Sequence, residues 1–203
     1  MKLNLQCYPL LGIISLVLAT GCSPYALQTA RTTPQGEFSV GLEGTSWIDT
    51  YPFWFGGSDP AELSNGFPQL GVVARYGITD NFDVGLHAGA FSFPHVDVKY
   101  RYAGTNDSEW ARSLGAVLGF GGDIGAYANH LISYHPKDNL AFYNSIQAGY
   151  APSIEDFVQG TVGLRYGREW GFFVEAGTIV RPRNENVLFN YGVGLSVNLS
   201  AFK

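Results

Sequence analysis

Charged residues are scarce in this chain. They make up 14% of its 203 residues, and 12 Lys and Arg stand against 17 Asp and Glu. The basic residues are scattered and form no positive patch of the kind that binds nucleic acid, so we exclude nucleic acid as a partner. Motifs for phosphate, dinucleotide or metal binding are also absent, because residues 119–122 (Gly-Phe-Gly-Gly) are followed by neither Lys-Ser/Thr nor a helix. We therefore expect no metal site and no cofactor.

Cysteine is equally scarce, since the chain contains only Cys7 and Cys22. Cys7 lies in an N-terminal stretch in which Lys2 is the sole charge before residue 31. The apolar run at 8–18 is shorter than the roughly 20 residues that a membrane-spanning helix needs, and it suits the core of a signal peptide. Cleavage after this run would remove Cys7 and leave no disulfide to form.

Residues 19–22 (Ala-Thr-Gly-Cys) resemble the lipobox of bacterial lipoproteins, in which the cysteine is lipidated and becomes the first residue. That family prefers Leu where this chain has Ala19, and Ser23 stands where an Asp would retain the protein in the inner membrane. The resemblance implies a signal peptide over 1–21, palmitate at Cys22, and delivery to the outer membrane of a Gram-negative-type bacterium by the lipoprotein-sorting machinery. The alternative is an ordinary secretory signal followed by a cysteine without a role.

Glycine and aromatic residues, by contrast, are abundant, at 26 Gly and 15% aromatics. Between Leu70 and Phe91, apolar residues alternate with small, polar or charged ones on both sides of a turn at 78–81. Alternate side chains of a strand share one face, so each arm has one apolar and one polar face. The pattern predicts a β-hairpin, and it recurs to the C-terminus.

This alternation predicts an all-β chain of about ten strands, with eight or twelve as alternatives because the sixth segment has the weakest pattern. The turns at 78–81, 104–109, 135–139 and 167–169 are short and would share one side of a membrane, whereas the connection at 48–66 is long. An even number of strands returns the C-terminus to the side of the N-terminus, as single-chain bacterial barrels require. The predicted strands are 37–47, 70–77, 82–91, 96–102, 113–120, 125–135, 140–148, 158–166, 170–177 and 189–198.

Aromatic residues flank the predicted short turns, as in the girdle at a membrane–water boundary. With the alternation, they make the chain resemble small bacterial outer-membrane β-barrels, here in a lipid-anchored variant. The resemblance implies an antiparallel up-and-down transmembrane barrel over 36–200 and a lipidated tether over 22–35. It also implies outer-membrane lipids and the barrel-assembly machinery as partners, while a soluble sandwich is the alternative. The flanking aromatics are Tyr76, Phe82, Tyr102, Trp110, Tyr166 and Trp170.

Nine titratable residues fall on the face that would line the barrel interior. Buried charges must be paired, and a narrow barrel is filled by side chains, so we interpret these residues as a mutually neutralising network. A selectivity lining for a small pore is the alternative, although open porins use about 16–18 strands. The nine residues are Glu43, Arg75, Asp83, His87, Asp97, Lys99, Arg101, Arg165 and Glu175.

The long connection begins with an aromatic cluster, formed by Trp47, Tyr51, Phe53, Trp54 and Phe55. These rings either complete the outer aromatic girdle or form a recognition surface for an unknown ligand or protein.

Four histidines, at 87, 95, 130 and 135, allow the hypothesis of a lipid-modifying hydrolase or acyltransferase that uses Ser, His and a carboxylate. No serine has a histidine at the spacing of such enzymes. The sequence therefore favours a structural or surface-interaction role without catalysis, with the lipid-modifying enzyme and a narrow channel as alternatives.

Overall fold

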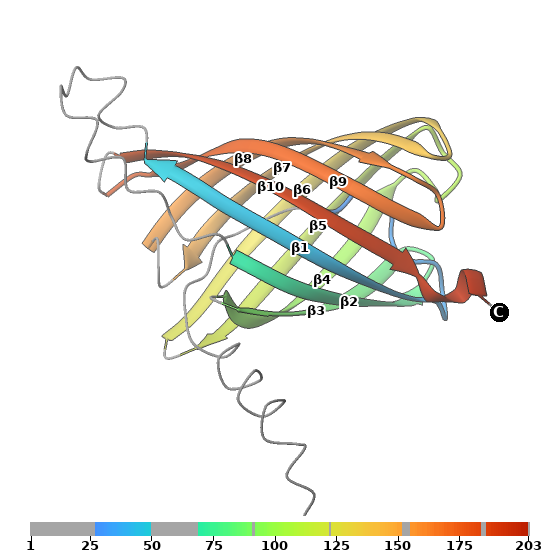
Figure 1. Cartoon of the computed structure of the whole chain (residues 1–203), viewed down its shortest axis with the longest axis horizontal. Helices are drawn as coiled ribbons and strands as arrows, with labels where there is room; N and C mark the ends of the chain where they lie inside the picture. Colours follow the sequence, from blue (N-terminus) through green and yellow to red (C-terminus); the bar gives the residue numbers. More distant parts are fainter. Residues whose placement is uncertain are drawn as a thin grey trace, which may run out of the picture.

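The computed structural model of the chain describes residues 27–49, 69–90, 92–121, 123–151, 155–183 and 186–202. Within these ranges, ten antiparallel strands follow one another around a closed barrel, and the first pairs with the last (Figure 1). The fold prediction of an up-and-down barrel of about ten strands is confirmed. No helix among the described residues is long and apolar enough to cross a membrane. The strands are β1 (Phe38–Asp49), β2 (Gln69–Thr79), β3 (Phe82–Ala90), β4 (Ser92–Ala103), β5 (Trp110–Gly121), β6 (Asp123–Lys137), β7 (Leu140–Ala151), β8 (Glu155–Tyr166), β9 (Trp170–Arg181) and β10 (Asn186–Asn198), and a 3-10 turn, η3 (Leu199–Phe202), follows.

The weakly patterned sixth segment is a full strand, β6, and at 15 residues it is the longest of those described. Its periodicity is hard to see because neither face is uniform. The outward face carries small Ala126 and Ala128, while fully buried Leu131 points inward among polar residues. The strand pairs with β5 along a continuous register and with β7 along a register that shifts between Tyr134 and Lys137, and the sequence does not display this pairing.

Burial in this barrel is the reverse of that in a water-soluble protein. Leu42, Leu70 and Val162, on the outer wall, each expose 62% of their surface, whereas Asp83 and Gln147, in the interior, expose none. Apolar surface that stays in water lacks the stabilisation of about 25 cal/mol per Å² that its burial would give. A wall that is apolar all the way round is stable when hydrocarbon covers it, as in an integral membrane barrel.

The short turns gather at one end of the barrel, called the turn end below, where β10 also ends (right in Figure 1). Aromatic side chains point outward around this end, and the Trp110 and Tyr134 rings stack with centroids 4.7 Å apart. One turn depends on Gly167, whose φ is 115°. A Cβ on Gly167 would lie 2.0 Å from the carbonyl oxygen of Trp170, so no other residue fits there without a backbone shift. The opposite end is the loop end.

Candidate functional site

An ion-pair cluster fills the barrel interior beside β2, β3 and β4. The Arg75 guanidinium donates to Asp83 Oδ1 at 2.5 Å and to Asp97 Oδ1 at 2.6 Å. Arg75 on β2 reaches Asp97 on β4 across β3, where the intervening residue in the register is Gly85. A Cβ on Gly85 would lie 2.1 Å from Asp97 Oδ2, so the missing side chain makes room for this pair.

His87 extends the same cluster to β1. Its Nδ1 lies 3.1 Å from Glu43 Oε1 and its Nε2 lies 2.8 Å from Asp97 Oδ2, while its ring stacks on His95 at a centroid distance of 4.2 Å. An imidazole can donate to two carboxylates only when both ring nitrogens carry protons. The geometry therefore suits an imidazolium between two carboxylates, buried away from water.

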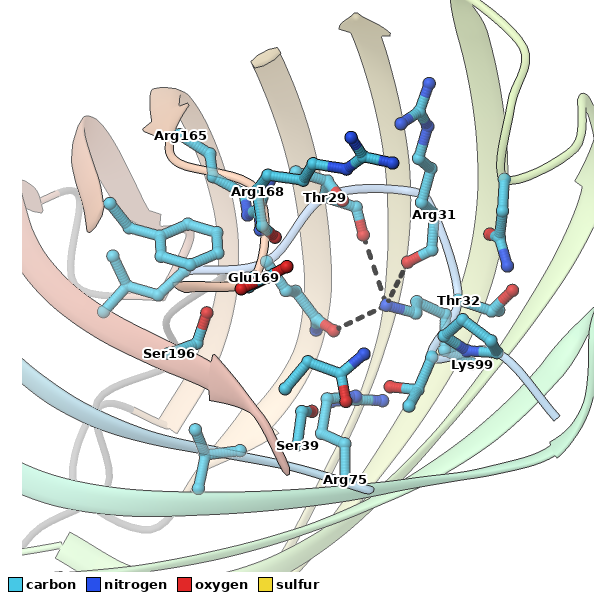
Figure 2. A pocket seen from close by; sticks show the side chains of 18 of the residues that line it. Thr29, Arg31, Thr32, Ser39, Arg75, Lys99, Arg165, Arg168, Glu169 and Ser196 are labelled. Carbon is cyan, nitrogen blue, oxygen red and sulfur yellow. Dashed lines mark hydrogen bonds between the residues drawn. The ribbon is translucent and has the colours of Figure 1, made fainter. Parts of the chain in front are cut away.

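Lys99 joins this cluster to a second feature, the inner segment, which we define as residues 27–36. Lys99 Nζ lies 3.5 Å from Asp83 Oδ2. The same ammonium donates to the carbonyl oxygens of Arg31 (2.9 Å) and Thr29 (3.2 Å) and to Gln28 Oε1 (3.2 Å), as Figure 2 shows. All three protons of one buried ammonium thus have acceptors on the inner segment.

The inner segment crosses the lumen from one wall to the other. The backbone N–H of Thr33 donates to Asp83 on β3 (2.8 Å), that of Ala30 to Ser133 on β6 (3.2 Å), and that of Leu27 to Glu175 on β9 (2.9 Å). Side chains of the barrel wall thus hold the backbone of the inner segment in place, and Ala30 is fully buried. The sequence did not indicate this position. The tether predicted over 22–35 has its described part, from residue 27 on, inside the barrel.

The remaining predicted interior charges lie apart from the Arg75 cluster. Glu175 accepts from the Tyr143 hydroxyl at 3.2 Å and from Leu27. Arg101 donates to the Asp80 carbonyl oxygen at 2.7 Å and to the Asn81 and Asn106 side chains at the turn end. Arg165 donates to the Arg168 carbonyl oxygen at 2.9 Å and lies over the Phe173 ring at 5.7 Å. The structure therefore brings together Glu43, Arg75, Asp83, His87, Asp97 and Lys99 and separates Arg101, Arg165 and Glu175 from them.

Around the inner segment a cavity of about 380 Å³ lies at the turn end (Figure 2). Side chains of both signs line it, among them Arg31, Glu43, Lys99 and Arg165. Farther toward the loop end, Phe157, Ile179 and Leu188 pack together inside the barrel with Ala151 and Tyr127. The described interior therefore holds a chamber at the turn end and an apolar cluster nearer the loop end.

A contact between Ser133 and His135 was missed by the sequence reading. The Ser133 hydroxyl lies 2.8 Å from His135 Nε2, and the spacing i, i+2 on a strand is the signal that could have found it. Ser133 is fully buried beneath Ala30, so a substrate has no access to its hydroxyl. Among the described residues, no carboxylate is hydrogen-bonded to His135, and the third member of a catalytic triad is missing there.

Other predicted site residues cannot be placed. Cys22, Tyr51, Phe53, Trp54 and Phe55 lie outside the described residues, and of Trp47 only the backbone, in β1, is described. Within the described ranges, no group of three or more His, Cys, Asp or Glu side chains is arranged to hold a metal ion.

Comparison with known proteins gives only distant structural likeness. No protein-family model and no curated protein matches the chain. The chain is similar to the KdgM porin, with 16% identity, a TM-score of 0.45 and coverage of 78% of this chain and 98% of that one. It is similar to the NanC porin, with 10% identity, a TM-score of 0.44 and coverage of 79% of this chain and 100% of that one. It is also similar to the COG4313 outer membrane channel from Pseudomonas putida F1, with 11% identity, a TM-score of 0.44 and coverage of 88% of this chain and 100% of that one. Likeness of this degree carries no argument about function.

Proposed function

We propose that this protein is an outer-membrane β-barrel, anchored by lipid at Cys22 and closed by its own inner segment, with a structural or surface-interaction role and no catalysis. Its immediate partners are outer-membrane lipids, together with the barrel-assembly and lipoprotein-sorting machineries that place it there. The single observation that carries the proposal is the inverted burial, with apolar side chains outside and an interior filled by ion pairs and chain.

The absence of catalysis is supported by how the histidines are engaged. Both ring nitrogens of His87 face carboxylates, and its ring face is covered by His95. The hydroxyl of Ser133, which lies next to His135, is covered by the inner segment. A nucleophile must reach the substrate, and a base must be free to take its proton. The described serine–histidine pair does not meet the first condition, because the Ser133 hydroxyl is fully buried.

One sample tests the anchor and the barrel together. Cells expressing the full chain are fed radiolabelled palmitate, and the outer-membrane fraction is run on a gel with and without heating. We expect label that disappears in Cys22→Ala, and a band whose mobility changes on heating because a closed barrel resists detergent until it is boiled. Unlabelled protein in the soluble periplasmic fraction would refute the proposal.

A second candidate function, a narrow channel, is favoured by one specific observation. The inner segment is held by side-chain contacts and by one isolated bridge, Gln35 to Gly77, and it is not a member of the sheet. Its departure would empty the turn-end chamber while leaving every strand pair intact. Planar-bilayer recordings compare the wild type with Lys99→Met, which removes the ammonium that holds the segment. Discrete conductance steps in the variant would support the channel, and a silent bilayer with both proteins would eliminate it.

A further inference from the structure

Arg112 on β5 is a charged side chain on the outer wall of the barrel. Its neighbours along the strand, Ala111 and Ser113, are buried toward the lumen, so the exposed Arg112 side chain points outward. None of the ion pairs in the described part of the chain includes Arg112, so no described carboxylate neutralises it. Ionisable residues that face the membrane are costly, and they are retained where they serve a function.

A hydrogen-bonded pair of polar rings lies beside Arg112. Tyr102 is the extra residue of β4 at the register shift opposite Arg112, and such a bulge re-aims its side chain. The Tyr102 hydroxyl lies across β5 at 2.8 Å from His130 Nε2 on β6, and the two rings are stacked with centroids 6.0 Å apart. His130 is the diagonal neighbour of Arg112, whose register partner is Ile132. We call Tyr102, Arg112 and His130 the outer polar patch.

The outer polar patch lies just below the aromatic girdle at the turn end. Arg112 is two residues from Trp110, and His130 is four residues from Tyr134, whose ring stacks on that of Trp110. At the usual strand rise and tilt, these separations place Arg112 about 5 Å and His130 about 10 Å deeper than the girdle. Girdle rings lie at the level of the lipid headgroups, and a long arginine side chain can reach back toward that level.

An apolar hollow continues from the outer polar patch toward the loop end. The next outward residue of β6 beyond His130 is Ala128. It pairs in register with Ala116 on β5 and with Ala148 on β7. Together with Ala126, these exposed alanines line a hollow of about 520 Å³ on the outer wall. The patch and the hollow thus follow one another in the order of the phosphate, the ester and the acyl chain of a phospholipid.

We propose that the outer polar patch and the hollow bind one phospholipid of the leaflet at the turn end, with its phosphate diester on Arg112 and an acyl chain in the hollow. A guanidinium binds phosphate oxygens through two parallel N–H···O bonds. When His130 Nε2 accepts from the Tyr102 hydroxyl, the neutral ring carries its proton on Nδ1, and that N–H donates to an ester carbonyl of the lipid. This inference rests on the membrane barrel proposed above.

A second copy of the chain fits this face less well than a phospholipid does. A two-fold dimer brings the same surface of both subunits together. Around an axis through the outer polar patch, the two Arg112 guanidinium groups would then face each other in a medium of low dielectric constant, where like charges repel strongly. A phosphate instead supplies the negative charge that the patch lacks.

Native mass spectrometry of the full-length protein, released from detergent after lipid is added, tests the site. The probes are phosphatidylglycerol and a diacylglycerol with the same chains but no phosphate. We expect one phosphatidylglycerol per barrel, with an affinity that falls about 10-fold in Arg112→Gln, whereas the weaker binding of diacylglycerol stays unchanged in that variant. Arg183→Gln is the matched control, because Arg183 is an exposed arginine at the loop end, and we expect its affinity for phosphatidylglycerol to equal that of the wild type.

Ala128→Leu tests the hollow without changing the charge, and we expect it to weaken the binding of both lipids. Equal affinity of the wild type and Arg112→Gln for phosphatidylglycerol, an unchanged affinity in Ala128→Leu, or dimers in place of lipid-bound barrels would overturn the inference. The heat-dependent gel shift shows that each variant is folded. A heat-modifiable outer-membrane barrel that binds no phosphatidylglycerol would refute this site and retain the proposed function, whereas bound phosphatidylglycerol without palmitate label would retain the site and refute the lipid anchor.

Discussion

Replacing Gly85 by Ala tests whether the interior ion pairs hold the barrel together. The new Cβ would lie 2.1 Å from Asp97 Oδ2 and 2.8 Å from Arg75 Nη1, so the pair must separate or the strand must shift. Overfilling a packed interior costs about 1–3 kcal/mol, and breaking a buried ion pair costs about 3–5 kcal/mol. After the substitution Arg75 can still bind Asp83, and Asp97 can still bind His87, so each partner retains one of its ionic contacts. We expect the free energy of unfolding to fall by about 3 kcal/mol.

The assay is a denaturant titration of the protein in lipid vesicles, followed by tryptophan fluorescence. Gly160→Ala is the matched control, because a Cβ on Gly160 of β8 would meet nothing within 4 Å. We expect the control to stay within about 0.5 kcal/mol of the wild type. If Gly85→Ala behaved like the control, the ion-pair cluster would contribute little to stability, and our reasoning about the filled lumen would be refuted.

Two further substitutions address the outer wall and the inner segment. Val162→Lys places a charge on an exposed apolar position of the outer wall. We expect the free energy of unfolding in vesicles to fall by about 2–4 kcal/mol, and no fall of this size for the control Val162→Ile. Equal stability of the two variants would contradict a lipid-covered wall. Lys99→Met removes three hydrogen bonds to the inner segment, and we expect trypsin to cleave after Arg31 about 10- to 100-fold faster. Cleavage after exposed Arg183 serves as the internal reference, and an unchanged ratio of the two rates would show that Lys99 does not hold the segment.

The strands were predictable because the period of two is a local property. Alternation placed Arg75, Asp83 and Asp97 on the interior face, and the structure has all three buried there. Their pairing was not predictable, since it depends on the register that puts Gly85 between two of them. The sixth strand gave a weak signal because alanines on its outer face blurred the contrast with the inner one.

The inner segment could not have been predicted from local sequence. Its Ser, Thr, Gln and Pro residues have the composition of a linker, and its binding groups come from distant strands. Leu27 and Glu175, for example, are 148 positions apart. Only the closed barrel brings those side chains to a common interior. The lipidation of Cys22 stays a prediction, as do the recognition role of the aromatic cluster and the domain boundaries.

The direct continuity of the inner segment with β1 has a mechanical consequence. The Gly36 N–H donates to the Gly77 carbonyl oxygen at the turn end, so the C-terminal end of the inner segment is fixed to the barrel wall. A segment attached at this end can leave the lumen only by turning about Gly36, whose φ of 74° lies in the region that glycine favours. Such a movement would leave the pairing of all ten strands intact, so the interior could be emptied and refilled without unfolding the barrel.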